Sequence, residues 1–153
     1  MTAIDDVLTA HPFFTGLDPD LLQRFTTCSR PVDFATDATI LQAGAPAHCM
    51  YAITKGRVAV GVRVPGRGLK VIETLQAGDI LGWSWLFEPY VWTFDAVAVK
   101  PVRAIEVGTA CIRQVLDADP AAAAVIYRSV GALMAERLAS ARLRLVDLFG
   151  EGH

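Results

Sequence analysis

Residues 39–87 read TILQAGAPAHCMYAITKGRVAVGVRVPGRGLKVIETLQAGDILGWSWLF, a series of short β-branched runs broken by glycine, proline and aspartate. In RVAVGVRV, residues 57–64, apolar and other residues alternate as they do along a strand with one buried face. PGRG at 65–68 has glycines where a hairpin turn requires a positive φ. Together with VAVKPVRAIEV at 97–107, these runs predict an antiparallel sandwich or roll.

Helical patterns flank this β region on both sides. AIDDVLTAHPFF at 3–14 and DPDLLQRFTTCS at 18–29 predict two short helices, the second capped by Asp18. TACIRQVLDAD at 109–119 predicts another, and a long helix follows from Pro120 to Phe149. We expect one domain over residues 1–153, with N-terminal helices at 1–30, a β-roll at 31–108 and C-terminal helices at 109–149.

The long helix carries a seam of apolar residues with a period of 3.5. The residues recur at steps of four, three, four and three, and they are Met134, Leu138, Ala141, Leu145 and Leu148. Such spacing favours pairing with a second helix and predicts a homodimer. For the first half of the helix, packing on its own β-roll is an equal alternative.

Composition excludes several classes of protein. The 14 basic and 16 acidic residues form no basic stripe, which argues against nucleic acid as a direct partner. No apolar run approaches the roughly 20 residues that span a bilayer. The N-terminus lacks the features of a signal peptide, so we expect a cytoplasmic protein. The three cysteines, Cys28, Cys49 and Cys111, are far apart and odd in number, and we expect free, buried thiols.

The chemistry of an enzyme is missing. The three histidines, His11, His48 and His153, are scattered, and no serine lies in a G-x-S-x-G motif. With His48 alone in the β region, the several histidines of a metal-dependent cupin cannot be assembled. We therefore expect no catalytic residue, no metal and no cofactor. The glycine-bounded turn QAGDILGWSWL could offer backbone N–H groups to an anion.

The order of these motifs resembles the cyclic nucleotide-binding domain family. QAGAPAHCMYAITKG, GRVAV and AGDILG are similar to three conserved pieces of that family's β-roll, the last being the start of its phosphate-binding cassette. HPFFTGLDPDLLQRF and IRQVLDADP resemble the helical segments before and after the roll. The resemblance implies a mainly β fold with flanking helices, a double-stranded β-helix or jelly roll, with a long C-terminal helix.

The cassette departs from the pattern that the resemblance implies. Members that bind cyclic AMP or GMP have a glutamate for the ribose and an arginine for the cyclic phosphate; an ungapped alignment puts Trp83 and Thr93 there. Phe94 and Asp95 stand at the following serine or threonine and alanine. Losing both polar contacts, with Asp95 repelling a phosphate, disfavours ordinary cyclic nucleotide binding by about 3–5 kcal/mol.

Two interpretations of the tryptophans remain open. The rings line a remodelled ligand pocket, or they fill the former pocket in place of a ligand. The candidate site residues are Leu81, Gly82, Trp83, Ser84, Trp85, Leu86, Trp92, Thr93, Phe94 and Asp95. Arg137 on the long helix is an additional candidate contact, and Arg63, Arg67 and Lys70 near the hairpin are further cations.

The sequence therefore predicts a non-catalytic regulatory or sensor domain with altered or lost cyclic nucleotide specificity. Its effector would be a small molecule, nucleotide-like or other. The chain ends soon after the long helix, without a helix-turn-helix, so we expect action through a dimer or a partner protein, with no direct contact to DNA or membrane. The alternatives are a ligand-free interaction module, a true cyclic AMP or cyclic GMP binder with non-standard contacts and, last, an enzyme.

Overall fold

The computed structural model describes residues 4–15 and 17–150. It forms two compact units, one ending at Val115 and the other beginning at Leu116. In the first unit, α1 (Ile4–Ala10), the short 3-10 helix η1 (Pro12–Phe14) and α2 (Pro19–Thr27) precede the strands. The helix α3 (Thr109–Ala118) follows them and runs across the boundary, and α4 (Pro120–Gly150) belongs to the second unit.

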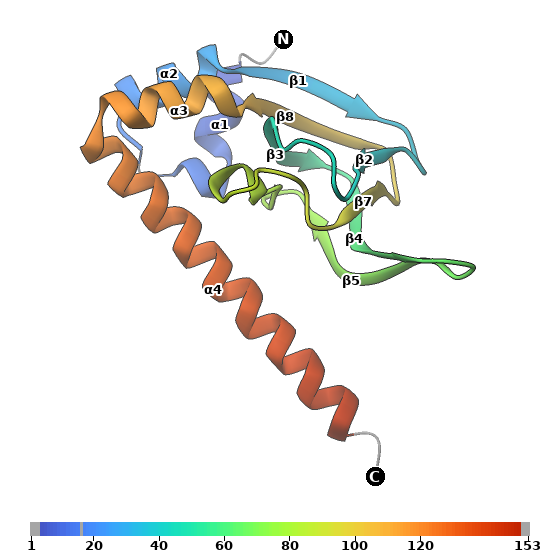
Figure 1. Cartoon of the computed structure of the whole chain (residues 1–153). Helices are drawn as coiled ribbons and strands as arrows, with labels where there is room; N and C mark the ends of the chain where they lie inside the picture. Colours follow the sequence, from blue (N-terminus) through green and yellow to red (C-terminus); the bar gives the residue numbers. More distant parts are fainter. Residues whose placement is uncertain (1–3, 16, 151–153) are drawn as a thin grey trace. The chain divides into compact units, whose positions relative to one another are not determined.

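The described strands form two antiparallel sheets of four strands each (Figure 1). The first sheet has the order β1 (Ser29–Phe34), β8 (Val102–Gly108), β3 (Cys49–Lys55) and β6 (Ile80–Leu81). The second has the order β2 (Thr39–Leu41), β7 (Asp95–Ala98), β4 (Arg57–Val64) and β5 (Gly68–Gln76). Because consecutive strands are distributed between two sheets, the topology is the predicted jelly roll, with helices before it and a long helix at the C-terminus.

Apolar side chains from both sheets make the core of the first unit. Ile53, Val58 and Ile80 are completely buried, as are Ala96 and Val107. They come from β3, β4, β6, β7 and β8. Ile53, Val58 and Val107 fall in runs that the sequence predicts as strands, whereas Ile80 and Ala96 lie just outside those runs. No helix among the described residues combines the length and the apolar character needed to span a bilayer.

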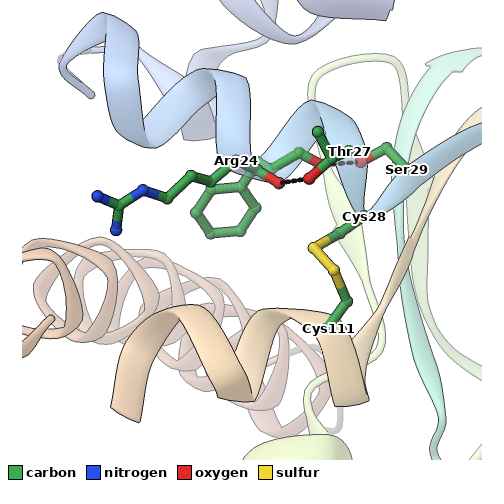
Figure 2. The surroundings of a disulfide bond; sticks show 6 residues. Arg24, Thr27, Cys28, Ser29 and Cys111 are labelled. Atoms are coloured by element: carbon green, nitrogen blue, oxygen red, sulfur yellow. Dashed lines mark hydrogen bonds between the residues drawn. A yellow bond between two sulfur atoms is a disulfide. The ribbon is translucent and has the colours of Figure 1, made fainter. Parts of the chain in front are cut away.

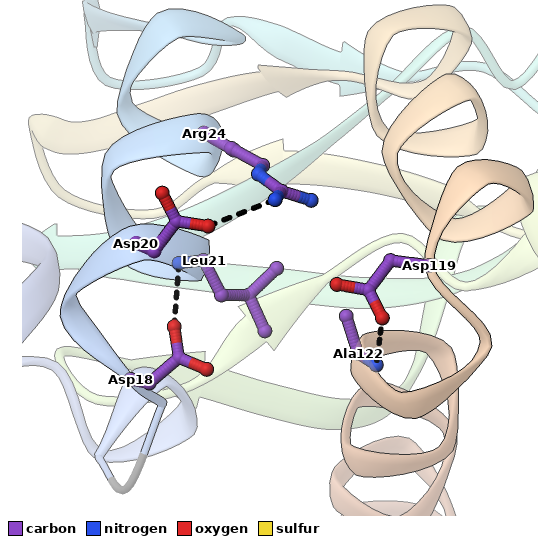
Figure 3. A network of polar contacts seen from close by, with 6 residues as sticks. All are labelled: Asp18, Asp20, Leu21, Arg24, Asp119 and Ala122. Carbon is purple, nitrogen blue, oxygen red and sulfur yellow. Dashed lines mark hydrogen bonds and ion pairs between the residues drawn. The ribbon is translucent and has the colours of Figure 1, made fainter.

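Aspartates cap two helices (Figure 3). Asp18 Oδ1 accepts a hydrogen bond from the N–H of Leu21 at 2.7 Å, as the sequence predicts for the start of α2. Asp119 Oδ1 accepts one from the N–H of Ala122 at 3.1 Å at the start of α4. Each side chain satisfies an N–H group that has no partner within its helix.

The expectation of three free thiols is wrong for two of the cysteines. Cys28 and Cys111 form a disulfide, with Cα atoms 5.6 Å apart (Figure 2). Cys28 directly precedes β1 and Cys111 lies in the first turn of α3, just after β8. Because β1 and β8 pair antiparallel from Ser29 opposite Val107, the two cysteines meet at the same end of the ladder. Cys49 is free and buried, as expected.

Candidate functional site

The predicted cassette is a compact loop between two strands. It begins with β6, whose Leu81 pairs with Tyr51 of β3, and continues through Gly82 into the 3-10 helix η2 (Ser84–Leu86). It ends at Asp95, the first residue of β7. Gly82 has φ +98°, and a Cβ atom at this position would lie 2.8 Å from two atoms of the Trp92 ring. Glycine is required here both by the backbone and by this close approach.

The three tryptophans lie in different environments. Trp85 and Trp92 are only 1% and 6% exposed, so both rings belong to the interior. Trp83 is partly exposed, and its ring packs against Phe13 of η1 with centroids 5.8 Å apart. The buried Trp85 Nε1 has no hydrogen-bond partner among the described residues. Of the predicted aromatic site residues, Phe94 is the most exposed, at 37%.

Polar residues of the cassette separate into a surface pair and a buried carboxylate. Ser84 Oγ and Thr93 Oγ1 are exposed and 3.4 Å apart. Asp95 is 5% exposed, and its Oδ1 accepts a hydrogen bond from the N–H of Ala43 at 3.0 Å. Its Oδ2 lies 3.8 Å from Nε of Arg63 on β4. Asp95 therefore ties β7 to the loop after β2 and uses one of the predicted hairpin cations as its counterion.

Arg113 of α3 holds the cassette in place, a role that the sequence does not predict. Its Nη2 donates a hydrogen bond to the carbonyl oxygen of Trp85, and its guanidinium lies over the Tyr90 ring at 4.1 Å from the centroid. Such stacking of a guanidinium on an aromatic ring is attractive. Sequence spacing does not predict this contact, because Arg113 and Trp85 are 28 residues apart and are brought together only by the tertiary fold.

Tyr90 is fixed by its main chain as well. It has φ +58°, an uncommon conformation for a residue with a side chain. Its N–H donates to the carbonyl of Phe87 at 2.8 Å, and its own carbonyl accepts from the N–H of Ala47 at 2.8 Å. The N–H of Trp92 likewise donates to the carbonyl of Ala45 at 2.9 Å. These bonds join the C-terminal half of the cassette to the loop before β3.

His11 lies beside the start of the cassette, although the sequence suggests only a connecting segment there. It is 4% exposed, and Nδ1 accepts a hydrogen bond from the N–H of Phe13 at 3.3 Å. Burial lowers the pKa of His11, while the main chain of Asp79 and of Ile53 and the Asp79 charge act in the opposite direction. An uncharged imidazole therefore fits this position best.

The remaining predicted site residues are distributed over both units. Leu81 is buried and Leu86 is partly buried within the cassette. Arg67 and Lys70 are exposed at and beside the β4–β5 turn. Arg137 belongs to α4, in the second unit, and its contact with a ligand stays a prediction. Among the described residues, no group of histidine, cysteine and acidic side chains could hold a metal ion.

Known proteins resemble both the sequence and the fold. The profile of the cyclic nucleotide-binding domain matches residues 31–119. A CRP-like cAMP-activated global transcriptional regulator of Mycobacterium tuberculosis is 26% identical over 145 residues. That match covers 95% of this chain and 63% of the regulator, so the chain spans somewhat less than two thirds of its relative.

Two solved structures show the same fold. A protein from Geobacter metallireducens, assigned to cyclic nucleotide binding, aligns with a TM-score of 0.81 and 25% identity over 90% of this chain and 99% of that one. The sensor domain of the transcriptional regulator DNR from Pseudomonas aeruginosa aligns with a TM-score of 0.71 and 20% identity, covering 90% and 95%.

Proposed function

Because the chain belongs to the cyclic nucleotide-binding domain family, we propose that it is a non-catalytic sensor domain whose cassette has altered or lost cyclic nucleotide specificity. We further propose that it works in the cytoplasm, as a homodimer or on a partner protein. The observation that carries the first proposal is the buried carboxylate of Asp95, at a position that the ungapped alignment equates with the alanine of the family's cassette.

The charge of Asp95 opposes an anionic ligand in this part of the cassette. Its carboxylate is almost fully buried, so water screens it poorly. Arg63 offsets part of the charge, but its side chain is about half exposed and the N–O separation is 3.8 Å, which makes a weak pair. Thr93, which the ungapped alignment puts at the phosphate-binding arginine, supplies a hydroxyl that lies close to Ser84. A neutral ligand suits such a surface better than a phosphate.

A second candidate function has support from the burial of Trp85 and Trp92. Side chains that are 1% and 6% exposed fill interior volume instead of lining an open surface. Arg113 also engages the carbonyl of Trp85, which stabilises this arrangement. The alternative is therefore a ligand-free interaction module, in which the cassette is permanently folded onto the roll.

The apolar seam of α4 supports the proposal that the protein acts as a homodimer. Leu138, Leu145 and Leu148 are 52%, 53% and 69% exposed, although leucine is normally buried. Met134 and Ala141 of the same seam are partly buried. A parallel or antiparallel pairing of two α4 helices would remove these side chains from water.

Calorimetric titration with cyclic AMP and cyclic GMP tests the specificity proposal. We expect wild-type binding to be at least about a hundredfold weaker than that of a Trp83→Glu, Thr93→Arg, Asp95→Ala variant, the ratio that 3 kcal/mol provides. Micromolar affinity of the wild-type protein for either nucleotide would refute altered specificity. The matched control is Asp33→Ala, which removes an exposed carboxylate of β1 outside the cassette.

Native mass spectrometry of the freshly purified protein separates a sensor from a ligand-free module. A retained small molecule that is lost in the Ser84→Ala, Thr93→Val double variant supports the sensor. Complete absence of added mass, together with no change in melting temperature across a metabolite screen, supports the module.

A further inference from the structure

The Cys28–Cys111 disulfide differs from the third cysteine in accessibility and reactivity. Both cysteines of the bond are partly exposed. Cys49 is 5% exposed, and burial raises the pKa of its thiol to about 11. A thiol with such a pKa holds almost no thiolate at neutral pH and is a poor nucleophile. Exchange chemistry is therefore confined to one pair of sulfurs.

The two cysteines of the disulfide lie at helix ends of opposite polarity: Cys111 at the N-terminus of α3 and Cys28 at the C-terminus of α2. Cys111 is the third residue of α3, where the helix N-terminus stabilises a thiolate. Cys28 is the C-cap of α2, and its N–H donates to the carbonyls of Phe25 and Thr26 at the negative end of that helix. The sulfur that forms the more stable thiolate leaves faster. Attack is therefore directed at Cys28 Sγ, with Cys111 as the leaving group.

The first turn of α3 connects this disulfide to the cassette. Two residues before Cys111, Thr109 donates its N–H to the carbonyl of His48 at 3.1 Å, and its hydroxyl lies 3.5 Å from the carbonyl of Ala47. Two residues after it, Arg113 holds the Trp85 carbonyl and the Tyr90 ring. Ala47 in turn bonds to the carbonyl of Tyr90. One short helical turn thus carries the disulfide and the contacts that fix the cassette.

We propose that Cys28 and Cys111 form a reversible redox site, modified by thiol–disulfide exchange with a cellular dithiol, and that its state sets the mobility of the cassette through Arg113. In the forward reaction a thiolate of the dithiol attacks Cys28 Sγ, and the Cys28–Cys111 bond breaks with its electron pair on Cys111. The second thiol of the dithiol then displaces Cys28, which takes up a proton, and the dithiol leaves as its own disulfide. The protein gains two electrons and the dithiol loses two.

This proposal rests on the cytoplasmic location put forward above but not on any ligand of the cassette. Disulfides in that compartment are usually transient, catalytic or redox-sensing, whereas those of secreted proteins are structural. Reduction removes the covalent link between α2 and α3, and α3 then depends on non-covalent contacts alone. Local opening of the segments that α3 holds becomes easier when such a link is lost.

Redox titration tests the chemical half of the proposal. Wild-type protein is equilibrated in buffers of reduced and oxidised dithiothreitol, its thiols are alkylated, and the intact mass is measured. We expect a single two-electron transition while circular dichroism stays native, with the same midpoint in a Cys49→Ala control. A pair that stays oxidised until the protein unfolds would be a structural disulfide and would overturn the proposal.

Hydrogen exchange without any nucleotide tests the coupling to the cassette. We expect amides of residues 84–92 to exchange at least about tenfold faster in reduced than in oxidised protein. A Cys28→Ser, Cys111→Ser variant should match the reduced protein under both conditions. Arg113→Met should exchange fast in both states while its disulfide still titrates. Equal exchange in both states of the wild type, or an unchanged redox response in Arg113→Met, would overturn the coupling.

Discussion

Replacing Gly82 by alanine tests the packing of the cassette more directly than any other single change. The residue has φ +98°, which costs a residue with a side chain about 1–3 kcal/mol. The added Cβ would also lie 2.8 Å from Cη2 and Cζ3 of Trp92, whose ring is only 6% exposed. Displacing a packed side chain typically costs about 1–3 kcal/mol more. We therefore expect Gly82→Ala to lower the free energy of unfolding by about 2–6 kcal/mol.

Gly44 provides a matched control within the same fold. It has φ +88°, but a Cβ atom there would have no neighbour within 4 Å. Gly44→Ala should therefore lose only the backbone contribution. The difference between the two variants isolates the contact with Trp92, and guanidinium unfolding followed by circular dichroism measures it.

A double-mutant cycle makes the test independent of the backbone. In a Trp92→Leu background the ring is absent, so Gly82→Ala should cost about as much as Gly44→Ala, a coupling of about 1–3 kcal/mol. Equal destabilisation by the two glycine substitutions, within about 0.5 kcal/mol, or a coupling near zero would refute the packing of Trp92 against Gly82.

Three further predictions concern parts of the molecule outside the cassette. Because the pKa of His11 is lower in the folded protein, the unfolded chain binds a proton at His11 more tightly, and the free energy of unfolding should fall as the pH drops below about 6.5. The variant His11→Asn, whose side chain can still cap η1, should show a weaker pH dependence in unfolding experiments. Because the disulfide joins residues 83 apart, the double variant Cys28→Ser, Cys111→Ser should have a free energy of unfolding about 4–5 kcal/mol lower than that of the oxidised protein. The reduced wild type should unfold at the same denaturant concentration as this variant. Leu145→Glu should convert a dimer to a monomer in light scattering, whereas the control Arg142→Glu, outside the seam, should leave the mass unchanged.

Local patterns were sufficient to predict the β region and its flanking helices, and the family resemblance supplied the jelly roll. Alternation in residues 57–64, the glycines at the turns and Asp18 at a helix start all depend on neighbouring residues, and the structure has a strand, a hairpin and a cap there. Strand β1 starts two residues earlier than the predicted boundary of the roll, at Ser29. Its pairing with β8 begins at Ser29, two residues after α2 ends, and short-range sequence patterns do not specify where a pair of strands stops bonding.

The site was predicted less completely because its key contacts are long-range. Disulfide partners 83 residues apart, and Arg113 against a carbonyl 28 residues earlier, become neighbours only through the sheet topology. The sequence also treats the three tryptophans as one group. In the structure Trp85 and Trp92 are interior side chains and Trp83 packs on η1, a distinction that depends on which side of the loop faces the roll.

The disulfide also has a mechanical consequence. It closes a covalent ring that contains every described strand, from β1 to β8, while α1 and α2 on one side, and most of α3 and all of α4 on the other, are tails outside the ring. A pulling force applied to the two tails would load the sulfur–sulfur bond and bypass the sheets. Reduction would open the ring and release up to roughly 270–300 Å of extended chain, because each residue spans about 3.3–3.6 Å. Oxidised, the domain transmits tension as a short rigid link; reduced, its β-roll becomes the element that bears it.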